Sequence, residues 1–229
     1  MKNKEIDDLD EIRRQILAAE EAEIWQEEPE DEYDETDKND PFGNASGNTE
    51  IIGKETKYQA HVFEVSKLSV RLPNGKIRQY DLVEHAPAVT IVPVTDDGQI
   101  LFVRQFRMGA DQDILELPAG ILNGENGNED PQEGAERECR EETGYEAKSI
   151  RRLGGFYMTP GYCTEYIHVF LAQQLVWNPL PQDDDEFLKV IQIPVEEAYR
   201  MAEAGEMNDV KTIAALMFAK NDIYFTKQS

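Results

Sequence analysis

Residues 129–145 constrain the fold more than any other part of this chain, because they predict a helix with a signal at each end. Asp130 is a favourable N-cap residue, and Pro131 suits the first helical position, where its missing N–H has no partner to lose. Glu133 stands where the carboxylate of a capping box reaches back to the cap. Gly144 supplies the left-handed residue that ends many helices. The chain is therefore expected to form one helix between these caps.

Three carboxylates gather on one side of this predicted helix. At about 100° per residue, Glu138, Glu141 and Glu142 fall within roughly a quarter of the circumference. Their charges repel one another, and the last two lie in the final turn, where the helix dipole disfavours negative charge. A solvated acidic face in an acidic protein is the simplest structural explanation. Binding of a hard divalent cation such as Mg²⁺ by carboxylate oxygens is the functional explanation, and it accounts for the crowding.

The order of residues around the carboxylates favours the functional explanation. Glu129 is followed, after seven residues, by the run Arg137-Glu138-Cys139-Arg140-Glu141-Glu142-Thr143-Gly144-Tyr145. This order resembles the Nudix box, a long and specific motif. The family pattern leaves five residues between a Gly and its first Glu, whereas eight separate Gly120 from Glu129 in this chain. The Gly-Asn-rich run 123–128 resembles a short insertion, and it leaves open whether Glu125 or Glu129 takes the first acidic role.

The resemblance covers about residues 55–220 and implies an α+β fold of the Nudix type, an α/β/α sandwich with a mixed β-sheet. It also implies a site for Mg²⁺, with Mn²⁺ as a substitute, in which Glu141 and Glu142 would act in catalysis. The expected metal ligands are Glu138, Glu141, Glu142 and the backbone carbonyl of Ala119. Arg137 and Glu129 would hold the loop and the helix in register.

Composition narrows the class of protein. The chain of 229 residues is long enough for one domain with a sizeable core and a small appended unit. Its net charge of −24 and its lack of a basic patch argue against nucleic acid and anionic membranes as partners. No apolar run approaches the length of a membrane span, and residues 1–4 do not begin a signal peptide. Cys139 and Cys163 are too few for a disulfide framework, so both are expected to be reduced thiols of a cytoplasmic protein.

Residues 1–54 are expected to form an acidic, largely disordered arm. Residues 1–50 hold 18 acidic and 5 basic side chains, and residues 27–50 are poor in apolar groups. Apolar residues near helical spacing over residues 5–26 predict a short helix. The arm has two interpretations, a solubilising tail and a docking helix for a partner, and the first is the simpler.

A β-rich pattern follows the arm. Residues 62–70 and 77–83 flank the turn signal Pro73-Asn74-Gly75-Lys76, which predicts a hairpin. Residues 55–85 are therefore expected to form a small antiparallel β unit.

The remaining segments are expected to complete a Nudix hydrolase domain over residues 86–222. A second strand pair is expected at 88–94 and 100–107, joined through Asp96-Asp97-Gly98. Further strands are expected at or near residues 113–117, 150–156, 166–176 and 187–193. Two closing helices are expected, one from Pro194 to about Gly205 and one capped by Asn208 or Asp209. Strands interspersed with helices, without regular βαβ alternation, indicate a mixed sheet covered on both faces.

Two segments beside the box resemble those of ADP-ribose pyrophosphatases, a Nudix subgroup. Before the box, Arg107 ends a predicted strand, and the resemblance implies that it contacts the diphosphate, a role that suits a guanidinium fork. After the box, Pro160 stands where a downstream proline marks the subgroup. Pro160, Gly161 and Glu165 would then belong to the substrate pocket. The structural alternatives are an ion pair for Arg107, a solvent-facing acid for Glu165 and an ordinary Gly-Pro turn.

The run Pro181-Gln182-Asp183-Asp184-Asp185-Glu186 lies between two predicted strands. Relatives carry in this loop an acid that activates the attacking water, and the resemblance implies a general base here. Asp185 and Glu186 lead because they stand nearest the following strand. A charge run is more often a solvated loop, so the choice among the four acids stays open.

With the resemblance, these residues predict Mg²⁺-dependent hydrolysis of ADP-ribose to AMP and ribose 5-phosphate. Hydrolysis of another nucleoside diphosphate sugar, an ADP- or GDP-hexose, is the alternative within the class. A non-catalytic ADP-ribose-binding regulator is a third hypothesis, and the complete set of box carboxylates argues against it. In relatives the small β unit builds a homodimer whose partner chain completes the adenine pocket, so a homodimer is expected.

Overall fold

The computed structural model describes residues 47–123, 128–181 and 187–225. Ten strands and three helices lie in these ranges, and none of the helices is long and apolar enough to cross a membrane. In chain order they are β1 (Glu50–Gln59), β2 (Phe63–Arg71), β3 (Ile77–His85), β4 (Ala88–Pro93), β5 (Gln99–Arg107), β6 (Gln112–Glu116), β7 (Ala119–Ile121), α2 (Pro131–Thr143), β8 (Tyr145–Tyr157), β9 (Tyr166–Trp177), β10 (Leu188–Pro194), α3 (Val195–Glu203) and α4 (Val210–Phe225). The helix predicted at residues 5–26 lies outside the described residues.

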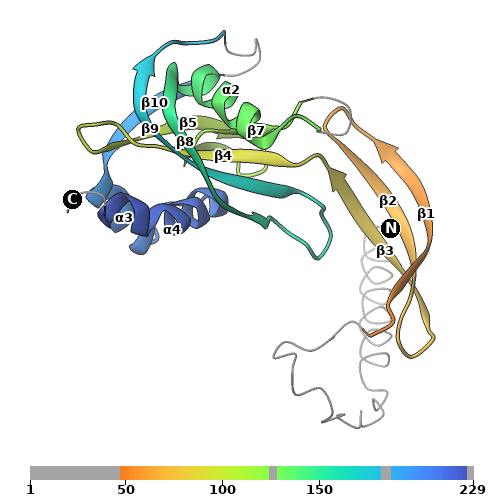
Figure 1. Ribbon diagram of the computed structural model, residues 1–229. Helices are drawn as coiled ribbons and strands as arrows, with labels where there is room; N and C mark the ends of the chain where they lie inside the picture. The colour runs from red at the N-terminus through yellow and green to blue at the C-terminus, as the bar shows by residue number, and fades with distance from the viewer. Residues whose placement is uncertain (1–46, 124–127, 182–186, 226–229) are drawn as a thin grey trace, which may run out of the picture. The chain divides into compact units, whose positions relative to one another are not determined.

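The first three strands form an antiparallel sheet in the order β1-β2-β3 (Figure 1). The predicted hairpin between β2 and β3 is present, and Gly75 turns with a φ of 77° that favours glycine. Strand β1 begins at Glu50, which pairs with Arg71, so residues 50–54 belong to the sheet and not to the arm, contrary to expectation. The error has a physical cause. Nearly every side chain of β1 is exposed, so its sequence lacks the alternation of apolar and polar residues that indicates a half-buried strand.

Two further sheets carry the rest of the strands. A four-stranded mixed sheet has the order β7-β4-β9-β8, and a three-stranded antiparallel sheet has the order β10-β5-β6. The prediction that β4 and β5 pair with each other is wrong. They share only the bridge between Val94 and Ile100, after which β4 pairs with β7 and with β9 in parallel, and β5 pairs with β6 and β10. The Asp-Gly turn determines only that the chain reverses direction between β4 and β5. Pairing with strands far along the sequence determines to which sheet each strand belongs.

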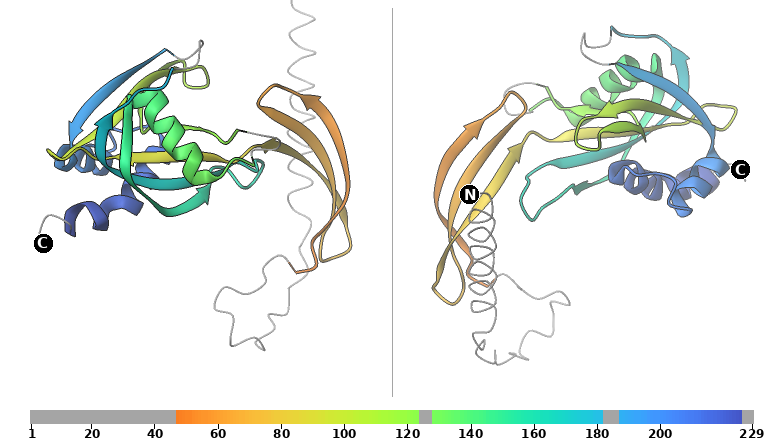
Figure 2. Two further views of the ribbon diagram at one scale, coloured as in Figure 1. Left: turned by 45° about the horizontal axis from the view of Figure 1, so that its top comes forward. Right: turned by 180° about the vertical axis from the view of Figure 1, so that it is seen from behind.

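Helices cover the four-stranded sheet on both faces, as an α/β/α sandwich requires (Figures 1 and 2). Alternate residues of β4 and β9 point to opposite faces and enter two separate cores. One core joins Val89, Ile91, Phe170 and Ala172 to Ala135 and Cys139 of α2. The other joins Val92, Val169 and Leu171 to α3 and α4, through Val195, Ala198, Ala215, Leu216 and Ala219. The α+β sandwich predicted from the sequence is therefore the observed fold.

Candidate active site

The orientation of α2 is set by its caps and its buried face. Asp130 accepts hydrogen bonds from the backbone N–H groups of Gln132 (2.9 Å) and Glu133 (3.3 Å), and Gly144 ends the helix at a φ of 81°. Since Ala135 and Cys139 are fully buried against the sheet, the neighbouring face of the helix turns toward β7. This face carries the carboxylates that the sequence singled out.

Glu138 and Glu142 lie against the start of β7. Glu142 is only 2% exposed, and its Oε2 accepts a hydrogen bond of 2.9 Å from the backbone N–H of Ala119. Glu138 is 7% exposed, and its carboxylate lies so close to Gly120 that a Cβ built there would come within 1.9 Å of Oε1. The structure thus brings together Ala119, Glu138 and Glu142, three of the four predicted metal ligands, around a glycine that leaves room for a carboxylate.

Arg137 connects the fourth predicted ligand to the same site. Its Nη1 donates to Glu138 Oε1 (2.6 Å) and to Glu141 Oε2 (2.8 Å). Its Nε and Nη2 donate to the two oxygens of Glu129, at 3.0 and 2.9 Å. Hydrogen bonds to Glu129 are the largest cause of the raised pKa of Arg137, and they lower the pKa of Glu129. Glu129 also accepts from the backbone N–H of Asn123, so it ties the loop to the helix.

Arg107 lies at the end of β5, where it pairs with Gln112 of the neighbouring strand β6. It donates to both oxygens of Glu116, with Nε at 2.7 Å from Oε1 and Nη2 at 2.8 Å from Oε2. This ion pair is the structural alternative that the sequence left open, yet 44% of the Arg107 side chain stays exposed. The pKa of Arg107 is raised, first by hydrogen bonding to Glu116 and further by the charges of Glu142 and Asp209. The guanidinium therefore lies within electrostatic reach of the buried carboxylate of α2.

Sequence reasoning missed Glu116 and Lys211 as members of this region. Glu116 is 2% exposed and Lys211 9%, and Lys211 Nζ donates to Glu116 Oε2 across 95 residues of sequence. One signal was available. Glu116 stands between two leucines in a strand, and buried carboxylates are almost always paired with a cation.

The donor set suits a hard divalent cation. Carboxylate and backbone carbonyl oxygens are the ligands that Mg²⁺ and Mn²⁺ prefer, and two of the carboxylates are buried one helical turn apart. In the ranges that the structure describes, no three acidic, histidine or cysteine side chains are gathered closely enough to hold a metal ion. Glu138 and Glu141 both accept hydrogen bonds from Arg137 Nη1. The residue types therefore fit the ion chemically.

The other predicted substrate residues lie on the turn between β8 and β9. Pro160 and Gly161 are exposed, and Glu165 Oε1 lies 4.0 Å from Nδ1 of His85 at the end of β3. Hydrogen bonds join this turn to β3, from Val83 N to Tyr162 O (2.7 Å) and from Thr164 N to Val83 O (3.0 Å). The predicted general bases Asp185 and Glu186, with Asp183 and Asp184, lie outside the described residues.

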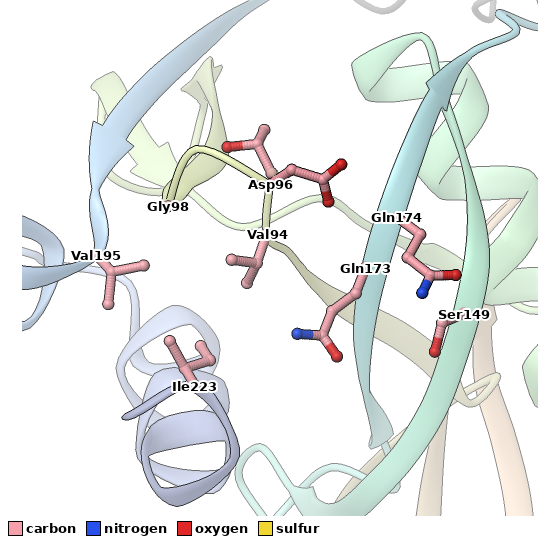
Figure 3. Close-up of a pocket in the computed structure, with 9 residues that line it drawn as sticks. Val94, Asp96, Gly98, Ser149, Gln173, Gln174, Val195 and Ile223 are labelled. Carbon is pink, nitrogen blue, oxygen red and sulfur yellow. The ribbon is translucent and has the colours of Figure 1, made fainter. Parts of the chain in front are cut away.

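A cavity of about 340 Å³ lies beside the turn that connects β4 and β5 (Figure 3). Its walls come from the β4–β5 connection, β8, β9, α3 and α4: Val94, Thr95, Asp96, Gly98, Ser149, Gln173, Gln174, Val195 and Ile223. None of the box residues contributes to this lining. The cavity is therefore separate from the carboxylates of α2.

The chain is similar to one family model, to several curated proteins and to a solved structure. A family model described as NUDIX domain matches residues 84–216. An ADP-ribose pyrophosphatase of Bacillus subtilis is 40% identical over 169 residues, which cover 73% of this chain and 90% of the relative. A methanol dehydrogenase activator of Bacillus methanolicus is 34% identical with the same coverage, and a GDP-mannose pyrophosphatase of Yersinia enterocolitica is 37% identical over 54% of this chain and 68% of the relative. A crystal structure of an ADP compounds hydrolase superposes with a TM-score of 0.71 at 23% identity, covering 82% of this chain and all of that one.

Proposed function

The chain belongs to the Nudix family as a pyrophosphohydrolase of nucleotide-sugar diphosphates, and from this premise we propose that it hydrolyses ADP-ribose to AMP and ribose 5-phosphate with Mg²⁺. The observation that carries this proposal is the burial of Glu138 and Glu142 against Ala119 and Gly120, within electrostatic reach of Arg107. Buried carboxylates suit a metal ion, and an exposed guanidinium that senses the charge of one of them suits a diphosphate.

The metal site would be formed by Glu138, Glu142, Glu141 and the carbonyl of Ala119. A bound Mg²⁺ supplies charge neutralisation of the diphosphate and acidification of a water molecule. Each remaining task falls to the protein. The half-exposed guanidinium of Arg107 donates to phosphate oxygens from the N–H groups that Glu116 does not use, and so orients the diphosphate.

Proton transfer is assigned to the loop before β10. Water adds its oxygen to one phosphorus, the P–O bond to the bridging oxygen breaks, and that oxygen leaves with the departing phosphate. A carboxylate from Asp183 to Glu186, with Asp185 and Glu186 as first choices, takes the proton of the attacking water. Pro160, Gly161 and Glu165 are assigned to the substrate pocket, an assignment that rests on the resemblance alone.

A homodimer formed through the β1-β2-β3 sheet is part of the proposal. Large apolar side chains are exposed on this sheet, and exposed apolar surface often serves for association with another chain. These side chains are Ile51, Tyr58, Phe63, Ile77 and Tyr80. Light scattering of the full chain would give twice the mass of one chain, and a monomer at working concentration would contradict the dimer. Location in the cytoplasm stays a prediction from the two free cysteines.

A second substrate is favoured by one observation, the similarity to a GDP-mannose pyrophosphatase. The test is turnover of ADP-ribose, ADP-glucose and GDP-mannose with Mg²⁺, with the products identified by chromatography. The proposal expects the highest kcat/KM for ADP-ribose, with AMP and ribose 5-phosphate as products. A preference for GDP-mannose would contradict the proposed substrate, and binding of ADP-ribose without turnover of any compound would favour the non-catalytic regulator.

A further inference from the structure

Glu116 is a buried carboxylate shared by two cations from distant parts of the chain. Arg107 occupies both of its oxygens with a bidentate pair of hydrogen bonds at 2.7 and 2.8 Å. Lys211, at the start of α4, donates to one of the same oxygens. Burial alone would raise the pKa of Glu116, but the hydrogen bonds from Arg107 and the charge of Lys211 lower it overall. Glu116 is therefore an anion that two cations hold.

The first turn of α4 is fixed so that Lys211 reaches this carboxylate. Asp209 caps the helix, and its Oδ2 accepts from the backbone N–H of Thr212 (3.0 Å), the hydroxyl of Thr212 (2.6 Å) and Lys211 Nζ (3.0 Å). The hydroxyl of Thr212 in turn accepts from the backbone N–H of Leu117 at 2.8 Å. The turn that carries Lys211 is thus attached to Leu117, which directly follows Glu116 and lies two residues before Ala119.

Lys211 limits how Glu116 and Arg107 can move. Lys211 Nζ donates to Glu116 and, at 3.0 Å, to Asp209 Oδ2, so two cations and two carboxylates form one cluster in which the charges balance. Since Glu116 is buried and held by Lys211, it fixes the edge of the Arg107 guanidinium that carries Nε and Nη2. Arg107 is the exposed member, with 44% of its side chain accessible against 11% for Lys211.

We propose that Lys211 is a positioning residue for the reaction: through Glu116 it orients the exposed side of the Arg107 guanidinium toward the diphosphate of the substrate. The inference rests on the proposed function. The competing account is that Lys211 and Glu116 form a buried ion pair that stabilises the fold and has no effect on the reaction.

The test is a double-mutant cycle between Lys211→Met and Arg107→Ala, with kcat and KM measured on the preferred nucleotide sugar. Lys211→Met alone should lower kcat/KM by about tenfold to a hundredfold, mainly through KM, the size expected for one charge-assisted contact. In the Arg107→Ala background the same change should cost almost nothing, because Lys211 acts only through Arg107. Lys211→Arg should restore most of the loss, since it keeps the charge. Lys220→Met, on the same helix and paired with Glu203, is the matched control and should leave both constants unchanged.

Equal losses from Lys211→Met in the wild-type and Arg107→Ala backgrounds would overturn the inference, and so would unchanged kinetics with a lowered unfolding temperature. Should Lys211→Met fail to fold, Glu116→Gln/Lys211→Met replaces it in both backgrounds with the same expected and overturning results, because it removes the buried carboxylate of Glu116 together with the cation that holds it. Failure of the proposed function has a different signature. In that case the wild-type chain itself would turn over none of the nucleotide sugars.

Discussion

Gly120 shows at the scale of one residue how the candidate site is made. The carboxylate of Glu138 occupies the space that a side chain at Gly120 would need, and the backbone N–H of Ala119 meets Glu142. The strand therefore presents bare backbone to two buried carboxylates. Arg137 completes the arrangement, because it donates hydrogen bonds to Glu138 and Glu141 while Glu129 holds it in place.

Glu142→Gln should abolish most of the activity without unfolding the protein. The amide oxygen of Gln can still accept the hydrogen bond from Ala119, but the charge that a metal ion requires is gone. We expect kcat to fall by on the order of 10³-fold, as the loss of several kcal/mol of transition-state stabilisation implies. Steady-state kinetics and a thermal melt check this, and a variant with a near-normal rate would remove Glu142 from the metal site.

Gly120→Ala separates activity from stability at the same place. The new methyl group must displace the end of the Glu138 side chain, which is flexible, so the unfolding free energy should change by less than about 1 kcal/mol. Activity should nevertheless drop by about tenfold or more, because a displaced carboxylate no longer ligates the metal ion in the productive geometry. Gly109→Ala is the control, since a Cβ at Gly109 meets nothing within 4 Å. Full activity of Gly120→Ala would show that the position of Glu138 is unimportant.

At the scale of elements, α2 joins a packing task to a chemical one. One face is buried against β4 and β9 through Ala135 and Cys139, and burial raises the pKa of the Cys139 thiol to about 11, so this cysteine stays an unreactive core residue. The adjacent face carries the charged network. The loop before the helix is bound to it through Glu129 and Arg137, which makes the helix start and the loop one unit.

The Glu129–Arg137 pair predicts how stability depends on pH. The folded-state pKa of Glu129 is lowered, chiefly by Arg137, so the pair stabilises the fold above the ordinary pKa of 4.5 and loses this contribution as the pH falls through the lowered value. Glu129→Gln should therefore cost about 1–2 kcal/mol at about pH 7 and much less at about pH 3. Thermal melts across this range measure it. Glu136→Gln, an exposed acid on the same helix, is the control, and a pH-independent cost for Glu129→Gln would contradict the assignment.

At the scale of the whole molecule, residues 48–229 form one compact unit, separate from residues 1–47. The described elements of the second unit include every strand and helix named above and all the candidate site residues outside the loop Asp183–Glu186. The acidic arm carries none of the predicted catalytic residues. Activity should therefore belong to the second unit.

Deleting residues 1–46 should leave kcat/KM within about twofold of the full chain, because terminal segments without catalytic residues tolerate removal. The cut has to precede Glu50, since β1 begins there and its pairing with β2 would otherwise be lost. Kinetics of the two lengths of chain check this. A large loss of activity on deletion would show that the arm contributes to the site or to its assembly.

The sequence predicted what local signals determine and missed what distant segments decide. The caps of α2 and the Asn-Gly hairpin follow from a few neighbouring residues, and both are found in the structure. The separation of β4 from β5 depends on partner strands far along the chain, which no turn signal specifies. The Glu116–Lys211 contact spans 95 residues, so only the burial of a charge could have suggested it. The roles of Pro160 and Glu165 stay predictions, because the structure places them on a turn by β3.

Titration of the protein with Mn²⁺, followed by electron paramagnetic resonance of the free ion, tests the central claim most directly. The claim is that the buried carboxylates of α2 hold a divalent cation. The wild-type chain and Glu133→Gln, an exposed acid in the first turn of the helix, should bind Mn²⁺ saturably and release it to Mg²⁺, whereas Glu138→Gln/Glu142→Gln should lose the site. Equal binding by the wild type and the double variant, or no binding by either, would contradict the account.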